Sequence, residues 1–191
     1  MESLISGYVE KALSQKPETF AHTKRVVNYC KIIAKTEEAD MNILITAAWL
    51  HDICWSGLDI TSKNIEAHPQ KSAELARKIL TKINISDRII QKIISAIANH
   101  ELRQENPEIE QKILFEADHL DRIGAIGISR LFSSWGITDS LKTINTKILP
   151  DMHSWFSTKK GIEFAKGKME FLNLFVDNYN TETLNSARGW Q

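Results

Sequence analysis

Apolar residues recur three and four positions apart along almost the whole chain, and strict alternation of apolar and polar residues is rare. This spacing is typical of helices that bury one face. Proline and glycine are few and fall where the pattern breaks. The pattern predicts helices over about residues 2–15, 18–37, 40–52, 69–83, 86–100, 107–121, 123–135 and 158–179, with a loop over 55–67. The sequence therefore predicts an all-α helical bundle.

The predicted helices form one continuous series without an internal repeat or a low-complexity segment. We expect a single domain over residues 1–191, with a core over about 18–136 and a helical C-terminal extension over about 139–180. Pro69 is expected in the first turn of its helix, where its missing N–H is tolerated. Gly136 is expected to interrupt the helical pattern after residue 135.

Composition narrows the class of protein. The chain has 191 residues, of which 42% are hydrophobic and 25% charged, a normal soluble mixture. The 24 basic and 24 acidic residues balance, so no bulk field favours a nucleic-acid polymer or an anionic membrane. Neither a signal peptide nor a long apolar run is present, and we expect a cytoplasmic protein. Cys30 and Cys54 are expected to be free core thiols.

Histidines and aspartates occur on or beside the apolar stripes of several predicted helices. The set comprises His22, His51, Asp52, His68, His100 and Asp118. A single histidine on an apolar face is more often a core residue hydrogen-bonded to a carbonyl group. A buried carboxylate, however, is costly unless it is paired or coordinated. One divalent ion would account for the whole set, since imidazole and carboxylate suit Mn, Ni, Co, Fe, Mg or Zn.

The same residues carry a family resemblance. Residues 21–26 (AHTKRV), 49–53 (WLHDI) and 115–118 (FEAD) resemble the His, His-Asp and distant Asp of the HD-domain superfamily of metal-dependent phosphohydrolases. Residues 116–127 (EADHLDRIGAIG) and 68–72 (HPQKS) look like its small bacterial, nucleotide-pyrophosphatase-like subgroup. The similarity covers about residues 18–180. His119 departs from the subgroup, where a basic residue is expected beside the aspartate, and a phosphate contact at that position is in doubt.

The resemblance implies an HD-domain helical bundle with one divalent ion, manganese among the choices, bound by His22, His51, Asp52 and Asp118. Such an ion lowers the pKa of its water and offsets charge on the attacked phosphorus. His68 and His100 fit three roles: general acid, phosphate ligand when protonated, or ligands of a second ion. The remaining candidates are Asp121 as an orienting residue or base, and Arg25, Lys71 and Arg122 as phosphate-binding cations.

We therefore expect an enzyme that cleaves a phosphate ester or anhydride of a small nucleotide-like substrate. The substrate, the number of ions and the oligomeric state stay open at this point. One alternative is an HD-type di-iron oxygenase, because certain relatives activate oxygen with six such ligands. The other is a regulatory module that binds a nucleotide or a metal without turnover.

Overall fold

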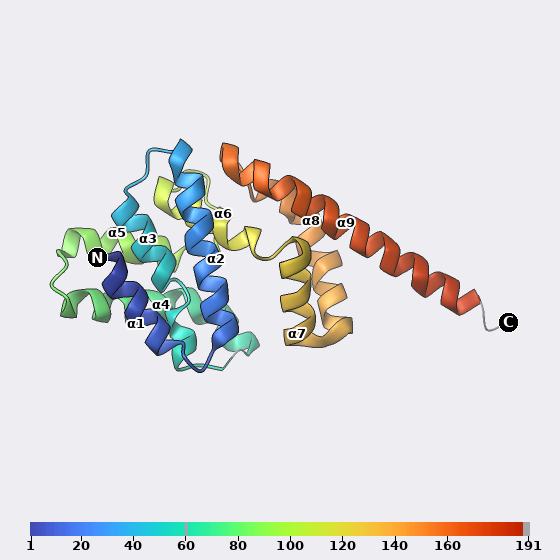
Figure 1. Cartoon of the computed structure of the whole chain (residues 1–191), viewed down its shortest axis with the longest axis horizontal. Helices are drawn as coiled ribbons and strands as arrows, with labels where there is room; N and C mark the ends of the chain where they lie inside the picture. Colours follow the sequence, from blue (N-terminus) through green and yellow to red (C-terminus); the bar gives the residue numbers. More distant parts are fainter. Residues whose placement is uncertain (60, 189–191) are drawn as a thin grey trace. The chain divides into compact units, whose positions relative to one another are not determined.

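The computed structural model describes residues 1–59 and 61–188, and every regular element in them is helical. Residue 60, within the loop predicted over 55–67, lies outside the described residues. The prediction of an all-α protein is confirmed. The helices are α1 (Glu2–Ala12), α2 (Pro17–Ile33), α3 (Met41–Leu50), α4 (Ser62–Lys82), α5 (Asp87–Ala98), α6 (Ile109–Leu120), α7 (Gly124–Thr143), α8 (Leu149–Asp151) and α9 (Lys159–Arg188), as Figure 1 shows.

Two compact units divide the chain, one up to Asp118 and one from His119 onward. The first unit holds α1 to α5 and most of α6, and the second holds α7 to α9. A single domain over the whole chain stays a prediction. Each unit is described by itself below.

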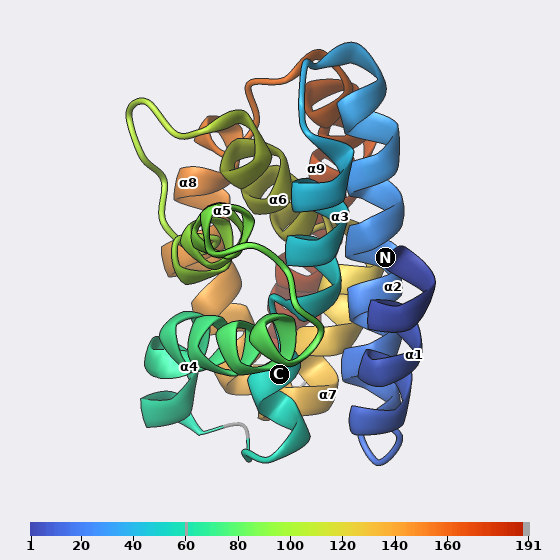
Figure 2. The ribbon, with the colours of Figure 1, turned by 90° about the vertical axis from the view of Figure 1, so that its left-hand side faces the viewer.

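In the first unit, α3 is the central helix. It contacts α1, α2 and α5, and Figure 2 shows α2 on one side of it and α5 on the other. Every residue from Ile43 to Leu50 is buried, as expected for a short helix that is hydrophobic all round. The Asp40 carboxylate begins this helix by accepting hydrogen bonds from the amides of Asn42 and Ile43. The beginning of α3 is thus fixed by a side-chain cap, and its buried residues pack against the neighbouring helices.

Helix α4 corrects one sequence-based prediction. It begins at Ser62, where the Thr61 hydroxyl caps it by accepting from the Asn64 amide at 3.3 Å. Pro69 consequently lies inside the helix, and the prediction that it occupies the first turn was wrong. The apolar pattern is weak before Pro69, whereas a threonine cap needs no apolar face to start a helix. The Pro69 ring leaves the carbonyl of Ile65, four residues earlier, without its usual N–H donor.

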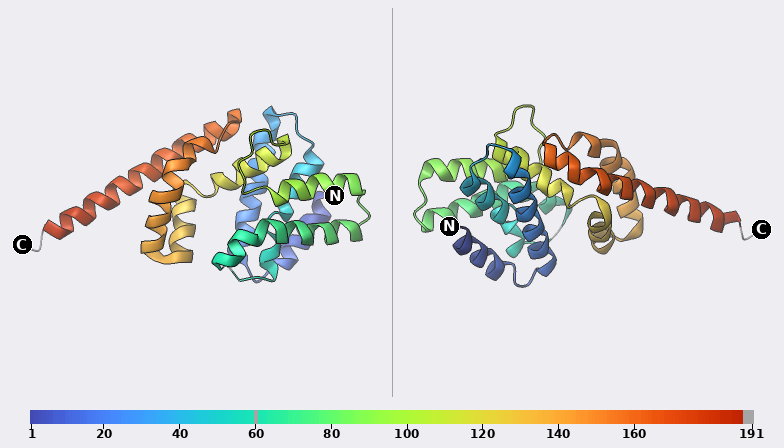
Figure 3. Two further views of the ribbon diagram at one scale, coloured as in Figure 1. Left: turned by 180° about the vertical axis from the view of Figure 1, so that it is seen from behind. Right: turned by 45° about the horizontal axis from the view of Figure 1, so that its top comes forward.

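The second unit is built on α7 and α9, which pack against each other, as the two views in Figure 3 show. Helix α7 bends at Gly136, where φ is 71° and ψ is −178°, angles that few residues other than glycine adopt. The predicted break after residue 135 is therefore confirmed. A methyl group at Gly127 would clash with the Arg122 carbonyl, so this first turn of α7 requires glycine.

Candidate metal centre

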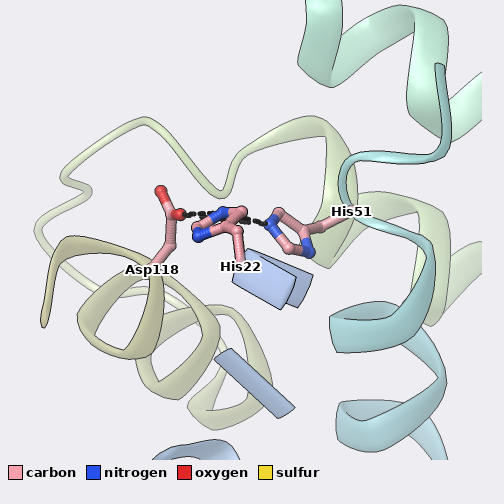
Figure 4. Close-up of side chains that lie close together, drawn as sticks. All are labelled: His22, His51 and Asp118. Carbon is pink, nitrogen blue, oxygen red and sulfur yellow. Dashed lines mark hydrogen bonds and ion pairs between the residues drawn. The ribbon is translucent and has the colours of Figure 1, made fainter. Parts of the chain in front are cut away.

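Three buried side chains meet in the first unit, two of them from helices and one from the residue that follows a helix, as Figure 4 shows. His22 lies on α2, His51 follows the last residue of α3, and Asp118 lies near the end of α6. The His22 Nε2 atom is 3.1 Å from Asp118 Oδ1 and 3.3 Å from His51 Nε2. The structure thus brings together residues that are far apart in the sequence.

The two carboxylate oxygens of Asp52 face different partners. One faces His22 and His51, and the other faces His68. Its Oδ2 atom is 3.5 Å from His22 Nε2 and 3.7 Å from His51 Nε2. Its Oδ1 atom is 3.4 Å from His68 Nε2. The carboxylate therefore lies between the pair His22–His51 and a second cluster that contains His68.

The second cluster consists of His68 on α4, His100 just after α5, and the adjoining Glu101. The His68 and His100 Nε2 atoms are 3.1 Å apart. Glu101 Oε1 lies 3.5 Å from His68 Nε2 and 3.9 Å from His100 Nε2. All six histidines and aspartates of the sequence-predicted set are thus gathered in one place.

Backbone carbonyls orient the imidazoles of His51, His68 and His100. The Nδ1 atom of His51 is 2.8 Å from the Ala48 oxygen, and that of His100 is 2.6 Å from the Ile97 oxygen. Both carbonyls lie within the last four residues of their helices, where intrahelical donors run out. A carbonyl accepts, so each Nδ1 must carry the proton. The lone pair of each neutral ring is then on Nε2.

Pro69 provides the equivalent carbonyl for His68 in the middle of a helix. His68 Nδ1 is 2.6 Å from the Ile65 oxygen, the acceptor that proline leaves free. His68 therefore also donates from Nδ1 and presents its Nε2 lone pair to His100. The unexpected position of Pro69 inside α4 has a direct consequence for the site.

Burial lowers the pKa of His51 to about 4, because the charged ring would lose its hydration and the neighbouring aspartates only partly offset that loss. His51 is consequently neutral at physiological pH, as a metal ligand must be. Burial alone would raise the pKa of Asp52, but the surrounding imidazoles, His51 foremost, outweigh it and lower the pKa. Asp52 is therefore an ionised carboxylate.

The donor set fits a divalent cation. In the first group, His22 Nε2 lies within 3.5 Å of three atoms that can act as ligands, which are Asp118 Oδ1, Asp52 Oδ2 and His51 Nε2. In the second cluster, the Nε2 atoms of His68 and His100 face each other at 3.1 Å. A cation placed among such buried ligand atoms interacts favourably with several of them at once. Neutral imidazoles held by carbonyls are the usual form of metal-ligating histidine.

The other predicted site residues are Arg25 and Lys71 in the first unit, and Asp121 and Arg122 in the second. Arg25 is half-buried on α2, one turn after His22. Lys71 donates to the Asn64 side chain at 2.9 Å. Asp121, fully buried in the second unit, pairs with Arg130 at 2.8 Å. The roles of Asp121 and Arg122 stay predictions.

Sequence reasoning missed Glu101 as a member of the second cluster. An acidic residue directly after a helix reads as an exposed terminal charge, although its position next to His100 was a usable signal. It also assigned Trp55 no contact with the aspartate. In the structure the Trp55 indole N–H donates to Asp52 Oδ1 at 3.1 Å.

The helical fold and the buried His/Asp cluster, a typical HD metal site, define the class of protein. A family model described as the HD domain matches residues 19–123, more than half of the chain. The chain belongs to the HD domain family.

YpgQ of Bacillus subtilis (strain 168), an uncharacterised protein, is 31% identical over 121 residues, which are 58% of this chain and 54% of YpgQ. In that alignment the chain spans about half the length of its curated relative. The crystal structure of YpgQ in complex with ADP matches with a TM-score of 0.75 at 22% identity, over 95% of this chain and 94% of that one. The crystal structure of a predicted HD superfamily hydrolase from an uncultured Thermotogales bacterium matches with a TM-score of 0.65 at 26% identity, over 94% of this chain and 91% of that one.

Among the described residues, no helix combines the length and hydrophobicity that crossing a membrane requires.

Proposed function

We propose that this chain is a metal-dependent phosphohydrolase that cleaves a phosphate ester or anhydride of a small nucleotide-like substrate. The observation that carries the proposal is the convergence of His22, His51, Asp52 and Asp118 through their ligand atoms. Membership of the HD domain family supports it. YpgQ has been crystallised with ADP, which supports a nucleotide as the kind of substrate.

The four residues of the first group would hold a divalent ion of the series Mn, Ni, Co, Fe, Mg or Zn, all of which accept imidazole and carboxylate. When bound, such an ion lowers the pKa of a water molecule and offsets charge on phosphoryl oxygens. Burial lowers the pKa of His51 and so keeps its imidazole neutral, as ligation requires. The carboxylates of Asp52 and Asp118 would balance the charge of the cation.

His68 and His100 would act on the leaving group. Their Nε2 atoms, 3.1 Å apart, can share one proton, and the shared proton is available to an oxygen that leaves phosphorus. Asp52 Oδ1 and Glu101 Oε1, both within 3.5 Å of His68 Nε2, stabilise the protonated pair. Arg25 and Lys71 are the cations of the first unit that we propose for phosphate binding.

The test is hydrolysis of a panel of nucleoside mono-, di- and triphosphates and cyclic nucleotides. Protein stripped with a chelator is refilled with Mn²⁺, Co²⁺, Ni²⁺ or Mg²⁺. We expect turnover that depends on the ion and is lost in His51→Asn. His153→Asn is the matched control, because His153 is exposed in the second unit. Bound metal without phosphate release from any substrate would refute the activity.

A second candidate function is favoured by one observation. The facing lone pairs of His68 and His100 suit a second ion as well as a proton, and six ligands around two irons would suit an oxygenase. Metal analysis after expression in iron-rich medium separates the two candidates. About two irons per chain with oxygen-dependent turnover would favour the oxygenase. Ion binding without turnover in either assay would favour a regulatory module that binds a nucleotide or a metal.

A further inference from the structure

The Trp55 side chain contacts both Asp52 and His68. Its indole N–H donates to Asp52 Oδ1 at 3.1 Å, and its ring stacks on His68 with centroids 5.4 Å apart and planes 27° from parallel. Only 5% of Trp55 is exposed. A buried indole N–H requires an acceptor, and here the acceptor is a carboxylate that faces both groups.

The local backbone explains why Trp55 reaches Asp52. Residues Ile53–Ser56 form a 3₁₀ turn, and the Trp55 amide donates to the Asp52 carbonyl at 3.1 Å. In a 3₁₀ turn, residues three apart lie one above the other. The side chain of Trp55 is therefore stacked over that of Asp52, and the same turn places its ring against α4, where His68 lies.

We propose that Trp55 is a positioning residue for the metal centre, which fixes the Asp52 carboxylate through its N–H and the His68 ring through stacking. The inference rests on the proposed metal site. Without the indole, the Asp52 carboxylate can rotate, and its two oxygens no longer face His22 and His68 at the same time. Partners that orient ligands in this way affect metal affinity about 10–100-fold when removed.

The test compares ion binding in Trp55→Phe with that of the wild type. Phenylalanine keeps a ring that can stack on His68 and removes the N–H. We expect the Co²⁺ dissociation constant, measured by calorimetry, to rise about 10-fold. Trp49→Phe is the matched control, because the Trp49 indole is also buried and donates to a carboxylate, that of Glu2 at 3.3 Å. Its Co²⁺ affinity should stay within about 2-fold of the wild type.

A double-mutant cycle separates positioning from a general structural role. If Trp55 acts through Asp52, Trp55→Phe in an Asp52→Asn background should change the remaining Co²⁺ affinity by less than about 2-fold. Three results would overturn the proposal. The first is an equal loss of Co²⁺ affinity in both backgrounds, and the second is wild-type Co²⁺ affinity in Trp55→Phe. The third is the same loss of affinity in Trp49→Phe as in Trp55→Phe. A wild-type protein that binds no Co²⁺ would also overturn it.

A measurement on the wild type keeps the test independent of how the variant folds. In NMR spectra of protein labelled with ¹⁵N-tryptophan, Zn²⁺ should shift one indole N–H resonance, and the Asp52→Asn substitution should shift the same resonance. The absence of a resonance that responds to both changes would overturn the proposal. The outcome is separable from that of the proposed function. Weaker ion binding in Trp55→Phe without hydrolysis refutes only the activity, and hydrolysis with unchanged ion affinity in Trp55→Phe refutes only this inference.

Discussion

Replacing Pro69 with alanine should make the protein more stable and impair the metal centre. Pro69 lies inside α4 and leaves the Ile65 carbonyl for His68 Nδ1, 2.6 Å away. Alanine restores a backbone N–H that competes for this carbonyl and draws α4 into a regular helix. The His68 ring then loses the partner that fixes its tautomer and orientation.

The magnitude follows from three effects. Proline in a helix interior is about 3 kcal/mol less favourable than alanine. Alanine gives the unfolded chain more freedom, which offsets about 1 kcal/mol of that gain, and the weakened His68 hydrogen bond offsets about 1 kcal/mol more. The net gain is about 1 kcal/mol, which corresponds to a rise in Tm of about 2–4 °C for a chain of this size.

The assays are thermal unfolding of the metal-free protein and Mn²⁺-dependent hydrolysis. We expect the higher Tm together with turnover reduced about 10-fold, because the partner that orients an imidazole is disturbed. Pro17→Ala is the matched control, since Pro17 occupies the first position of α2, where its missing N–H is tolerated. A lower Tm in Pro69→Ala, or turnover equal to that of the wild type, would refute the reasoning.

Three further predictions concern the site and its support. The unfolding free energy of the metal-free protein should fall by up to about 3 kcal/mol as pH falls from about 6.5 to 4. His51 is protonated in the unfolded chain over this range, whereas the folded ring, with a pKa of about 4, stays neutral. Urea titrations in the presence of a chelator test this, and a stability that rises on acidification would contradict it. Asp118→Asn should weaken Mn²⁺ binding, measured by calorimetry, more than about 100-fold. Asp151→Asn is the control, because Asp151 is exposed and its substitution should leave the Mn²⁺ affinity unchanged. Equal Mn²⁺ affinities in the two variants would argue against Asp118 as a metal ligand. Gly127→Ala should cost about 1–3 kcal/mol through the clash with the Arg122 carbonyl, and an unchanged Tm would show that this turn can relax.

The helices themselves were predictable because their apolar spacing is local information. Gly136 as a break was read from residue type, and this prediction is confirmed. The prediction that Pro69 lies in the first turn of its helix was wrong for two reasons. Proline is common in that position, and the residues between the Thr61 cap and Pro69 show little apolar periodicity. The end of α9 at Arg188 was likewise missed, since its last turns carry mostly polar residues.

The site was predictable only in part. Periodicity placed His22 and His51 on buried faces, and one shared divalent ion accounted for the whole set. The family resemblance then indicated which of these residues would bind the ion. The interatomic geometry could not be predicted, because it depends on tertiary packing of α2, α3 and α6. Glu101 and the contact of Trp55 with Asp52 come from helix ends and a 3₁₀ turn, where side-chain direction is not periodic.

The central claim is that the imidazoles and carboxylates of the first unit hold a catalytic cation. Anomalous diffraction from crystals of the full chain loaded with Mn²⁺ tests it most directly. We expect an anomalous peak within bonding distance of His22 Nε2, His51 Nε2 and the carboxylates of Asp52 and Asp118. Fully loaded crystals with no peak among these four side chains would contradict the account.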